Sequence, residues 1–117
     1  MRRGEIVVWR HASQHAMLVA DCTQTTAERM RGLLGSKPLL EGQALWITPC
    51  NSVHCWFMSY AIDVVYLCRQ GRIIKCVECL KPWRISGCFS AASVVELAAG
   101  EVVRLGLQVG DEVRWCD

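Results

Sequence analysis

The sequence predicts a mainly β fold of the β-rich α+β class, a compact antiparallel sandwich or barrel with two short helices. Short apolar runs bounded by turn residues recur along the chain, and they outnumber the helical patterns by about three to one. The turns between these runs are short, as in antiparallel sheets. No linker rich in proline, glycine or serine interrupts the 117 residues, so we expect a single domain over residues 1–117.

The expected strands follow one another along nearly the whole chain. They lie in EIVVW, HAMLVADC, QALWIT, the segment that begins at Cys50, DVVYLC, RIIKCVECL, SVVEL and the residues after VGD. A turn at Ala12 to Gln14 joins the first two, and Gln70-Gly71 is typical of a hairpin turn. Residues 63–68 show no polar alternation after Asp63, which indicates a strand buried on both faces inside a sheet.

Two segments have a helical pattern. In TTAERMRGLLG, Thr25 and Glu28 have the spacing of a capping box, and Gly35 stands where a C-terminal glycine belongs. The apolar residues of this segment share one helical face. GEVVRLG predicts a second short helix that begins near Gly100 and ends at Gly106.

Composition and charge argue against two classes of partner. The 13 Lys and Arg residues and 11 Asp and Glu residues are scattered, whereas nucleic-acid binders concentrate basic residues in a patch, so we expect no nucleic-acid partner. No apolar run is long enough to span a membrane. Arg2 and Arg3 precede too short an apolar run for a signal peptide, which makes the cytoplasm the default location unless a leader was removed.

The eight cysteines are expected to be reduced and mostly packed as small apolar side chains. Cys76 and Cys79 form a CxxC, but in a strand such residues point to opposite faces, which favours packing over a metal or redox site. Cys50, His54 and Cys55 offer soft metal ligands without any standard zinc spacing. We therefore expect neither a metal nor a cofactor, and a thiol or metal site stays an alternative.

A histidine and a carboxylate in the segment from Cys50 to Cys68 are the polar groups of most interest. Ser52, His54 and Asp63 could be assembled as nucleophile, base and orienting acid, but no nucleophile elbow surrounds the serine. Asp63 stands beside an apolar run, so its burial requires a partner, either an arginine or backbone amides. Arg31 is our expected partner.

Three segments together are similar to a known family. TTAERMRGLLG, ALWITPCNSVHCWFMSYAIDVVYLCRQGRIIKC and VVELAAGEVVRLGLQVGDEV, in this order, resemble the prokaryotic family called domain of unknown function 192. The resemblance covers roughly Val19 to Val113. It implies a compact, β-rich, sandwich-like fold without an established enzymatic activity. Many members look exported, which this chain does not.

The same resemblance implies where a site shared by the family would lie. The positions of Arg31, His54, Met58 and Asp63 belong to the family pattern, whereas the extra cysteines do not. This weakens a function based on thiols.

Three functional hypotheses follow. The first is a non-catalytic module that binds a small polar ligand or a protein segment through residues that combine polar groups with an apolar wall: Arg31, Ser52, His54, Trp56, Met58 and Asp63. The second is a thiol or metal protein that uses Cys50, His54, Cys55, Cys76 and Cys79. The third is a weak hydrolase with His54 and Asp63 as base and orienter. The oligomeric state is left open.

Overall fold

The computed structural model describes residues 1–25, 28, 38–54 and 59–116 and, within these, every side chain but that of His54. Its strands are β1 (Arg2–Arg10), β2 (Ser13–Cys22), β3 (Gln43–Ile47), β4 (Ser52–His54), β5 (Ile62–Leu67), β6 (Ile73–Leu80), β7 (Ile85–Gly87), β8 (Ser93–Ala98) and β9 (Glu112–Cys116). The helix α2 (Glu101–Leu105) lies between β8 and β9. The mainly β fold is therefore confirmed.

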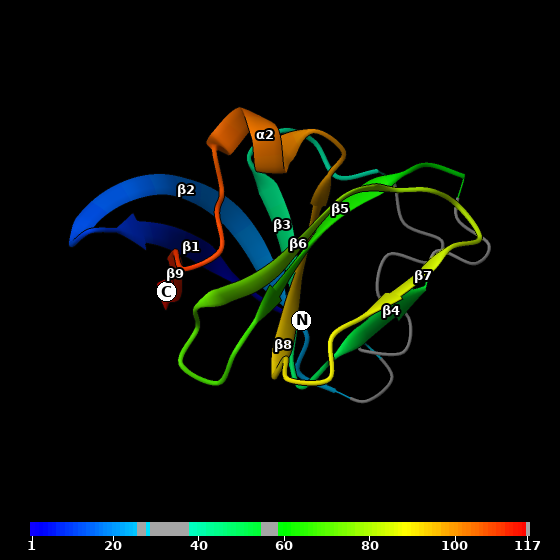
Figure 1. The fold of residues 1–117 in the computed structure, drawn as a ribbon, viewed down its shortest axis with the longest axis horizontal. Coiled ribbons are helices and arrows are strands. Elements are labelled where there is room, and N and C mark those ends of the chain that lie inside the picture. The colour runs from blue at the N-terminus through cyan, green and yellow to red at the C-terminus, as the bar shows by residue number, and fades with distance from the viewer. Residues whose placement is uncertain (26–27, 29–37, 55–58, 117) are drawn as a thin grey trace.

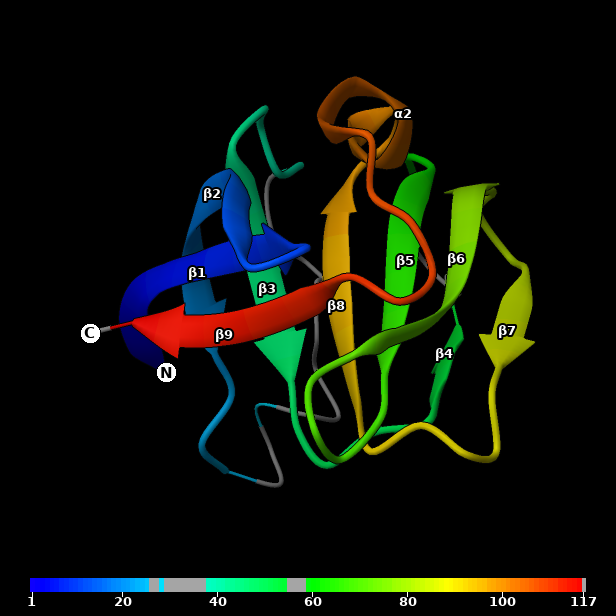
Figure 2. The same ribbon diagram turned by 60° about the vertical axis from the view of Figure 1, so that its left-hand side comes forward.

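Seven strands form one mixed sheet in the order β6-β5-β8-β3-β2-β1-β9, and β4 and β7 form a second, small sheet. All pairs are antiparallel except β2 with β3, which run parallel. The large sheet curls, so that β9 crosses in front of β3 and β8 (Figure 2). Its two outer strands approach each other at an isolated bridge between Arg72 and Glu112, and within the described residues the curl does not close further.

Two apolar clusters fill the two sides of this sheet. The first lies inside the curl and includes Ile6, Leu18 and Leu97, with Val102 of α2 closing one end. The second lies on the outer side of β3, β5 and β8, where the β4–β7 sheet is set apart from the large one (Figure 1). Because β5 is sandwiched between the clusters, all six of its residues are buried, as its unbroken apolar pattern predicts.

Local signals explain several boundaries. Thr25 and Glu28 make both bonds of the predicted capping box: the Glu28 amide donates to Thr25 Oγ1 and the Thr25 amide to Glu28 Oε1. The rest of the helix expected over residues 25–35 lies outside the described residues. The second helix is confirmed, with Gly100 and Gly106 flanking it in left-handed conformations. Gly71 has φ +83° in the β5–β6 hairpin turn predicted at that position.

The β1–β2 turn differs from its prediction. It consists of His11 and Ala12, between the paired residues Arg10 and Ser13, and both turn residues have positive φ, 50° and 63°. This is the backbone of a two-residue type I′ turn, which asparagine and glycine suit better than histidine and alanine. The strands also slip by one residue between Val8 and Trp9, at a bulge.

Replacing Ala12 with glycine should therefore stabilise the protein. An alanine in the left-handed conformation costs roughly 1–2 kcal/mol, and glycine removes this strain. Part of the gain in stability is offset because glycine has greater conformational freedom in the unfolded chain. We expect Ala12→Gly to raise the free energy of unfolding by about 0.5–1 kcal/mol, measured by urea denaturation. Ala12→Val, which places a β-branched residue at the same φ, should lower it; equal effects of the two variants would contradict this account.

Candidate functional site

The β4–β7 sheet has one face toward the large sheet and one toward solvent. Val53 and Ser86 form a pair on the inner face, where Val53 is buried and the Tyr66 hydroxyl donates to Ser86 Oγ at 2.9 Å. Side chains alternate along a strand, so the neighbouring pair, Ser52 and Gly87, belongs to the outer face, as does Ile85. The sheet therefore presents Ser52 and Ile85 outward, with a gap at Gly87.

This outer surface is hollowed into a groove of about 530 Å³. Its walls are apolar: Ile85 is 69% exposed and Phe89 is 103% exposed. A Cβ atom at Gly87 would lie 3.6 Å from the Asn51 carbonyl oxygen and 3.7 Å from Ser52 Cβ, which is ordinary contact. Gly87 therefore forms the bottom of the groove and leaves space for a ligand above its backbone. The lining residues are Asn51, Ser52, Val53, Ile85, Ser86, Gly87, Cys88 and Phe89.

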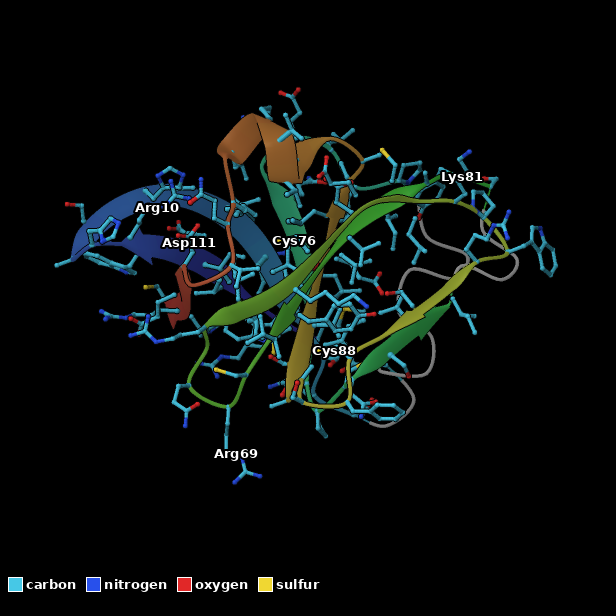
Figure 3. The ribbon with its side chains drawn as sticks, in the orientation of Figure 1. Arg10, Arg69, Cys76, Lys81, Cys88 and Asp111 are labelled. Atoms are coloured by element: carbon cyan, nitrogen blue, oxygen red, sulfur yellow. The ribbon has the colours of Figure 1, made fainter. Side chains whose placement is uncertain are left out.

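A second, more polar hollow of about 640 Å³ adjoins the groove, and the two share Asn51 and Phe89. Its lining also includes Thr48 and Arg69. Arg69 reaches into solvent from the loop between β5 and β6 (Figure 3). No hydrogen bond or ion pair engages its guanidinium among the residues that the structure describes. We call the apolar hollow the β4–β7 groove and the adjoining polar hollow its Arg69 end.

A buried acid lies on the side of the large sheet that faces the β4–β7 sheet. Glu96 of β8 stands between Leu45 of β3 and Val64 of β5, both members of the second cluster. It is 4% exposed, and burial raises the pKa of its carboxyl to about 7. Burial also raises the pKa of nearby Tyr66, whose bond to Ser86 acts in the opposite direction. Glu96 is not among the site residues predicted from the sequence.

Asp63 is fully buried, with 0% of its surface exposed, and its carboxylate holds three elements together. Oδ1 accepts from the Cys79 amide of β6 at 2.9 Å. Oδ2 accepts from the amides of Gly100 and Val102 at 3.1 and 2.8 Å, at the start of α2. Backbone amides, one of the two predicted kinds of partner, are thus confirmed. The expected partner Arg31 lies outside the described residues, and the ligand-binding role of Asp63 stays a prediction.

The other predicted site residues divide into two groups. Ser52 is exposed and lines the groove. His54 pairs through its backbone with Ile85, while its side chain, like Cys55, Trp56 and Met58, falls outside the described part of the structure.

Among the described residues, Cys50, Cys76 and Cys79, which the alternative hypotheses invoke, are not joined in disulfide bonds. Cys50 Sγ donates to the Ser52 carbonyl at 3.1 Å. Cys76 packs against the first cluster, whereas Cys79 is exposed at an irregularity of β6 with φ +52°. Within the described ranges, no group of three or more His, Cys, Asp and Glu side chains is arranged to hold a metal ion. No described helix is long and apolar enough to cross a membrane.

The second wall of the groove, formed by β7 and Phe89, was not predicted from the sequence. Strand β7 has only three residues, ISG, and the surrounding serine and glycine are typical of a loop. The signal that could have found it is the pair of large apolar residues, Ile85 and Phe89, standing in an otherwise polar segment.

Comparisons with known proteins agree on one family. Residues 7–115 match the family DUF192, described as "Uncharacterized ACR". A UPF0127 protein of Thermococcus sibiricus is 28% identical over 97 residues, which are 78% of this chain and 62% of that protein. Another of Pyrococcus furiosus is 32% identical over 94 residues, 75% of this chain and 78% of that protein. The chain thus spans less than two thirds of the length of the first of these relatives.

Two solved structures share the fold. A protein of unknown function from Novosphingobium aromaticivorans has a TM-score of 0.85 and 18% identity, covering 97% of this chain and 85% of its own. A proposed transcription regulator from Sinorhizobium meliloti has a TM-score of 0.87 and 18% identity, covering 97% of this chain and 94% of its own. At this identity the likeness shows the fold alone.

Proposed function

The chain belongs to the DUF192 family of unknown function, and from that premise we propose that it is a non-catalytic module that binds a small amphiphilic carboxylate in the β4–β7 groove. The observation that carries the proposal is the groove itself. Its volume of about 530 Å³ lies within the range of small-molecule sites, and apolar walls with a few polar atoms are their usual lining.

The apolar part of the ligand would lie between Ile85 and Phe89. Side chains this large and this exposed are costly to leave in water, and burying them against a ligand removes that cost. Gly87 leaves space for the ligand between them, and Ser52 supplies a hydroxyl at the floor.

The charge of the ligand follows from the Arg69 end. A guanidinium without a carboxylate partner in the described structure complements an anion, and its planar fork suits a carboxylate. The occupant that fits both ends is therefore a molecule with an apolar chain and one carboxylate group.

The other hypotheses receive less support. In the hydrolase, Asp63 would orient His54, but both carboxylate oxygens of Asp63 already accept backbone hydrogen bonds. The thiol or metal alternative relies in part on Cys55 and the His54 ring, which lie outside the described residues. Both stay predictions, as do the cytoplasmic location and the absence of a nucleic-acid partner.

Calorimetric titration with octanoate and with 1-octanol tests the proposal. We expect octanoate to bind with a saturable isotherm, and 1-octanol to bind more weakly because it lacks the charge. Arg69→Gln should weaken octanoate about tenfold and leave 1-octanol unchanged, since one charge-assisted hydrogen bond is lost.

Two substitutions at Gly87 provide a matched pair. Gly87→Ala adds one methyl group at ordinary contact distances and should retain binding, whereas Gly87→Leu fills the groove and should abolish it. Binding that survives Gly87→Leu in a protein with an unchanged melting temperature would refute this site.

A further inference from the structure

A third hollow, of about 540 Å³, lies between the β1–β2 turn and the loop that leads into β9, at the end of the molecule away from the β4–β7 sheet (Figure 3). We call it the turn hollow. It is rich in charged groups, with Arg10, Arg72, Arg114 and His11 against Asp111 and Glu112. The three guanidinium groups face two carboxylates, so the lining carries an excess of positive charge.

Each of the two carboxylates forms a hydrogen-bonded ion pair with a different arginine. Arg10 binds Asp111 through two hydrogen bonds of 2.7 Å, and the two side chains point toward each other (Figure 3). Asp111 is buried, and the pKa of its carboxyl is held below its ordinary value chiefly by Arg10. Arg114 binds Glu112 at 2.9 and 3.1 Å and stacks over the Trp9 ring.

Arg72 is the third cation: its charge also helps to lower the pKa of Glu112, but among the described residues it forms no ion pair with either carboxylate. Its guanidinium donates a single hydrogen bond, Nη1 to the Gly110 carbonyl at 3.2 Å, among the residues that the structure describes. The backbone beneath it is firmly held: the Ile73 amide donates to the Asp111 carbonyl and the Gly110 amide to the Ile73 carbonyl, both at 2.8 Å. The remaining guanidinium donors of Arg72 are thus presented on a fixed support.

The opposite rim of the turn hollow departs from regular backbone geometry twice. His11 and Ala12 have positive φ, and β2 carries a bulge in which the extra residue His15 lies opposite the Val8–Trp9 step of β1. Residues held in unfavourable backbone regions, and bulges, gather at binding sites, where they aim particular side chains. His11 occupies a turn position that asparagine and glycine favour, it lines the hollow, and an imidazole N–H can donate a hydrogen bond there.

We propose that the turn hollow binds the oxyanion of a small molecule, with Arg72 as its charged contact and His11 as a second donor from the opposite rim. Phosphate and carboxylate groups share this chemistry, because both present several oxygens to a guanidinium fork. The site is distinct from the β4–β7 groove, since the two have no lining residue in common.

Backbone amide NMR on the full chain tests the proposal, with titrations of inorganic phosphate and of succinate at constant ionic strength. We expect saturable shifts at His11, Ala12 and Gly110. Arg72→Gln should weaken the tighter of the two anions at least about tenfold, whereas Arg72→Lys, which keeps the charge, should weaken it less. Tighter binding of phosphate would assign a phosphorylated ligand, and tighter binding of succinate a carboxylated one.

Arg84→Gln is the matched control, because it removes the same charge from an exposed residue outside the hollow. It should leave both titrations unchanged. Shifts that rise linearly without saturation, or an equal loss in Arg84→Gln and Arg72→Gln, would show general charge screening and overturn the proposal. Unchanged binding in Arg72→Gln would overturn it as well.

Discussion

Replacing Glu96 with glutamine is expected to stabilise the protein at neutral pH by roughly 3 kcal/mol. Glu96 is enclosed by the second cluster, and burial raises the pKa of its carboxyl from 4.5 to about 7. At neutral pH the ionised Glu96 carboxylate is hydrated in the unfolded chain, whereas burial prevents this hydration in the folded protein. The unfolded state is therefore favoured. Glutamine has nearly the same shape and no charge to hydrate, so this advantage of the unfolded state disappears.

The effect has a definite dependence on pH. Because the folded state keeps its proton to a higher pH than the unfolded state, Glu96 lowers the stability progressively as pH rises from 4.5 to about 7. The difference in unfolding free energy between Glu96→Gln and the parent should be close to zero at pH 4 and reach its full value above pH 7. Carboxyls whose pKa is lowered by arginines, such as Asp111 and Glu112, change the free energy of unfolding with pH in the opposite direction. These contributions are common to both proteins, so they cancel in the difference.

Urea denaturation of both proteins at a series of pH values measures this difference. Glu78→Gln on the exposed part of β6 is the matched control and should change stability by less than about 0.5 kcal/mol. A difference between Glu96→Gln and the parent that does not vary with pH would show that Glu96 is solvated or paired in the native protein.

Replacing Asp63 with asparagine is expected to lower the free energy of unfolding by an amount on the order of 1–3 kcal/mol. The carboxylate accepts from three backbone amides, of Cys79, Gly100 and Val102. An asparagine can accept at only one side-chain atom, so its NH₂ group must face at least one of these N–H donors. The substitution therefore leaves buried donors unsatisfied at the start of α2 or at β6.

Amide hydrogen exchange locates this damage. In Asp63→Asn, the amides of Gly100 and Val102 or that of Cys79 should exchange faster than in the parent, beyond the general loss of stability. Asp21→Asn, which breaks a surface pair with Arg3, should cost less than about 1 kcal/mol. An unchanged denaturation midpoint in Asp63→Asn would mean that the three bonds contribute nothing to stability.

The features that the sequence predicted correctly rest on local physical chemistry. An uninterrupted apolar run identified β5, glycines marked the ends of α2, and the spacing of Thr25 and Glu28 identified their two hydrogen bonds. The need of Asp63 for a partner followed from the cost of burying a charge. Each of these signals lies within a few residues of the feature it predicts.

The features that were missed depend on which distant segments meet. Hydrophobic periodicity identifies a strand but not its neighbour, so the parallel pairing of β2 with β3 was not predicted. Arg10 and Asp111 lie 101 positions apart, and no pattern in the sequence connects them. The β4–β7 groove requires Gly87 to stand opposite Ser52, which only the pairing of two three-residue strands brings about.

The most direct test of the binding function is a measurement of intermolecular nuclear Overhauser effects between octanoate and the protein. We expect contacts from the methylene protons of octanoate to the side chains of Ile85 and Phe89, with the carboxylate end nearest to Arg69. Contacts to residues elsewhere on the surface, or none at octanoate concentrations that saturate the calorimetric isotherm, would contradict it.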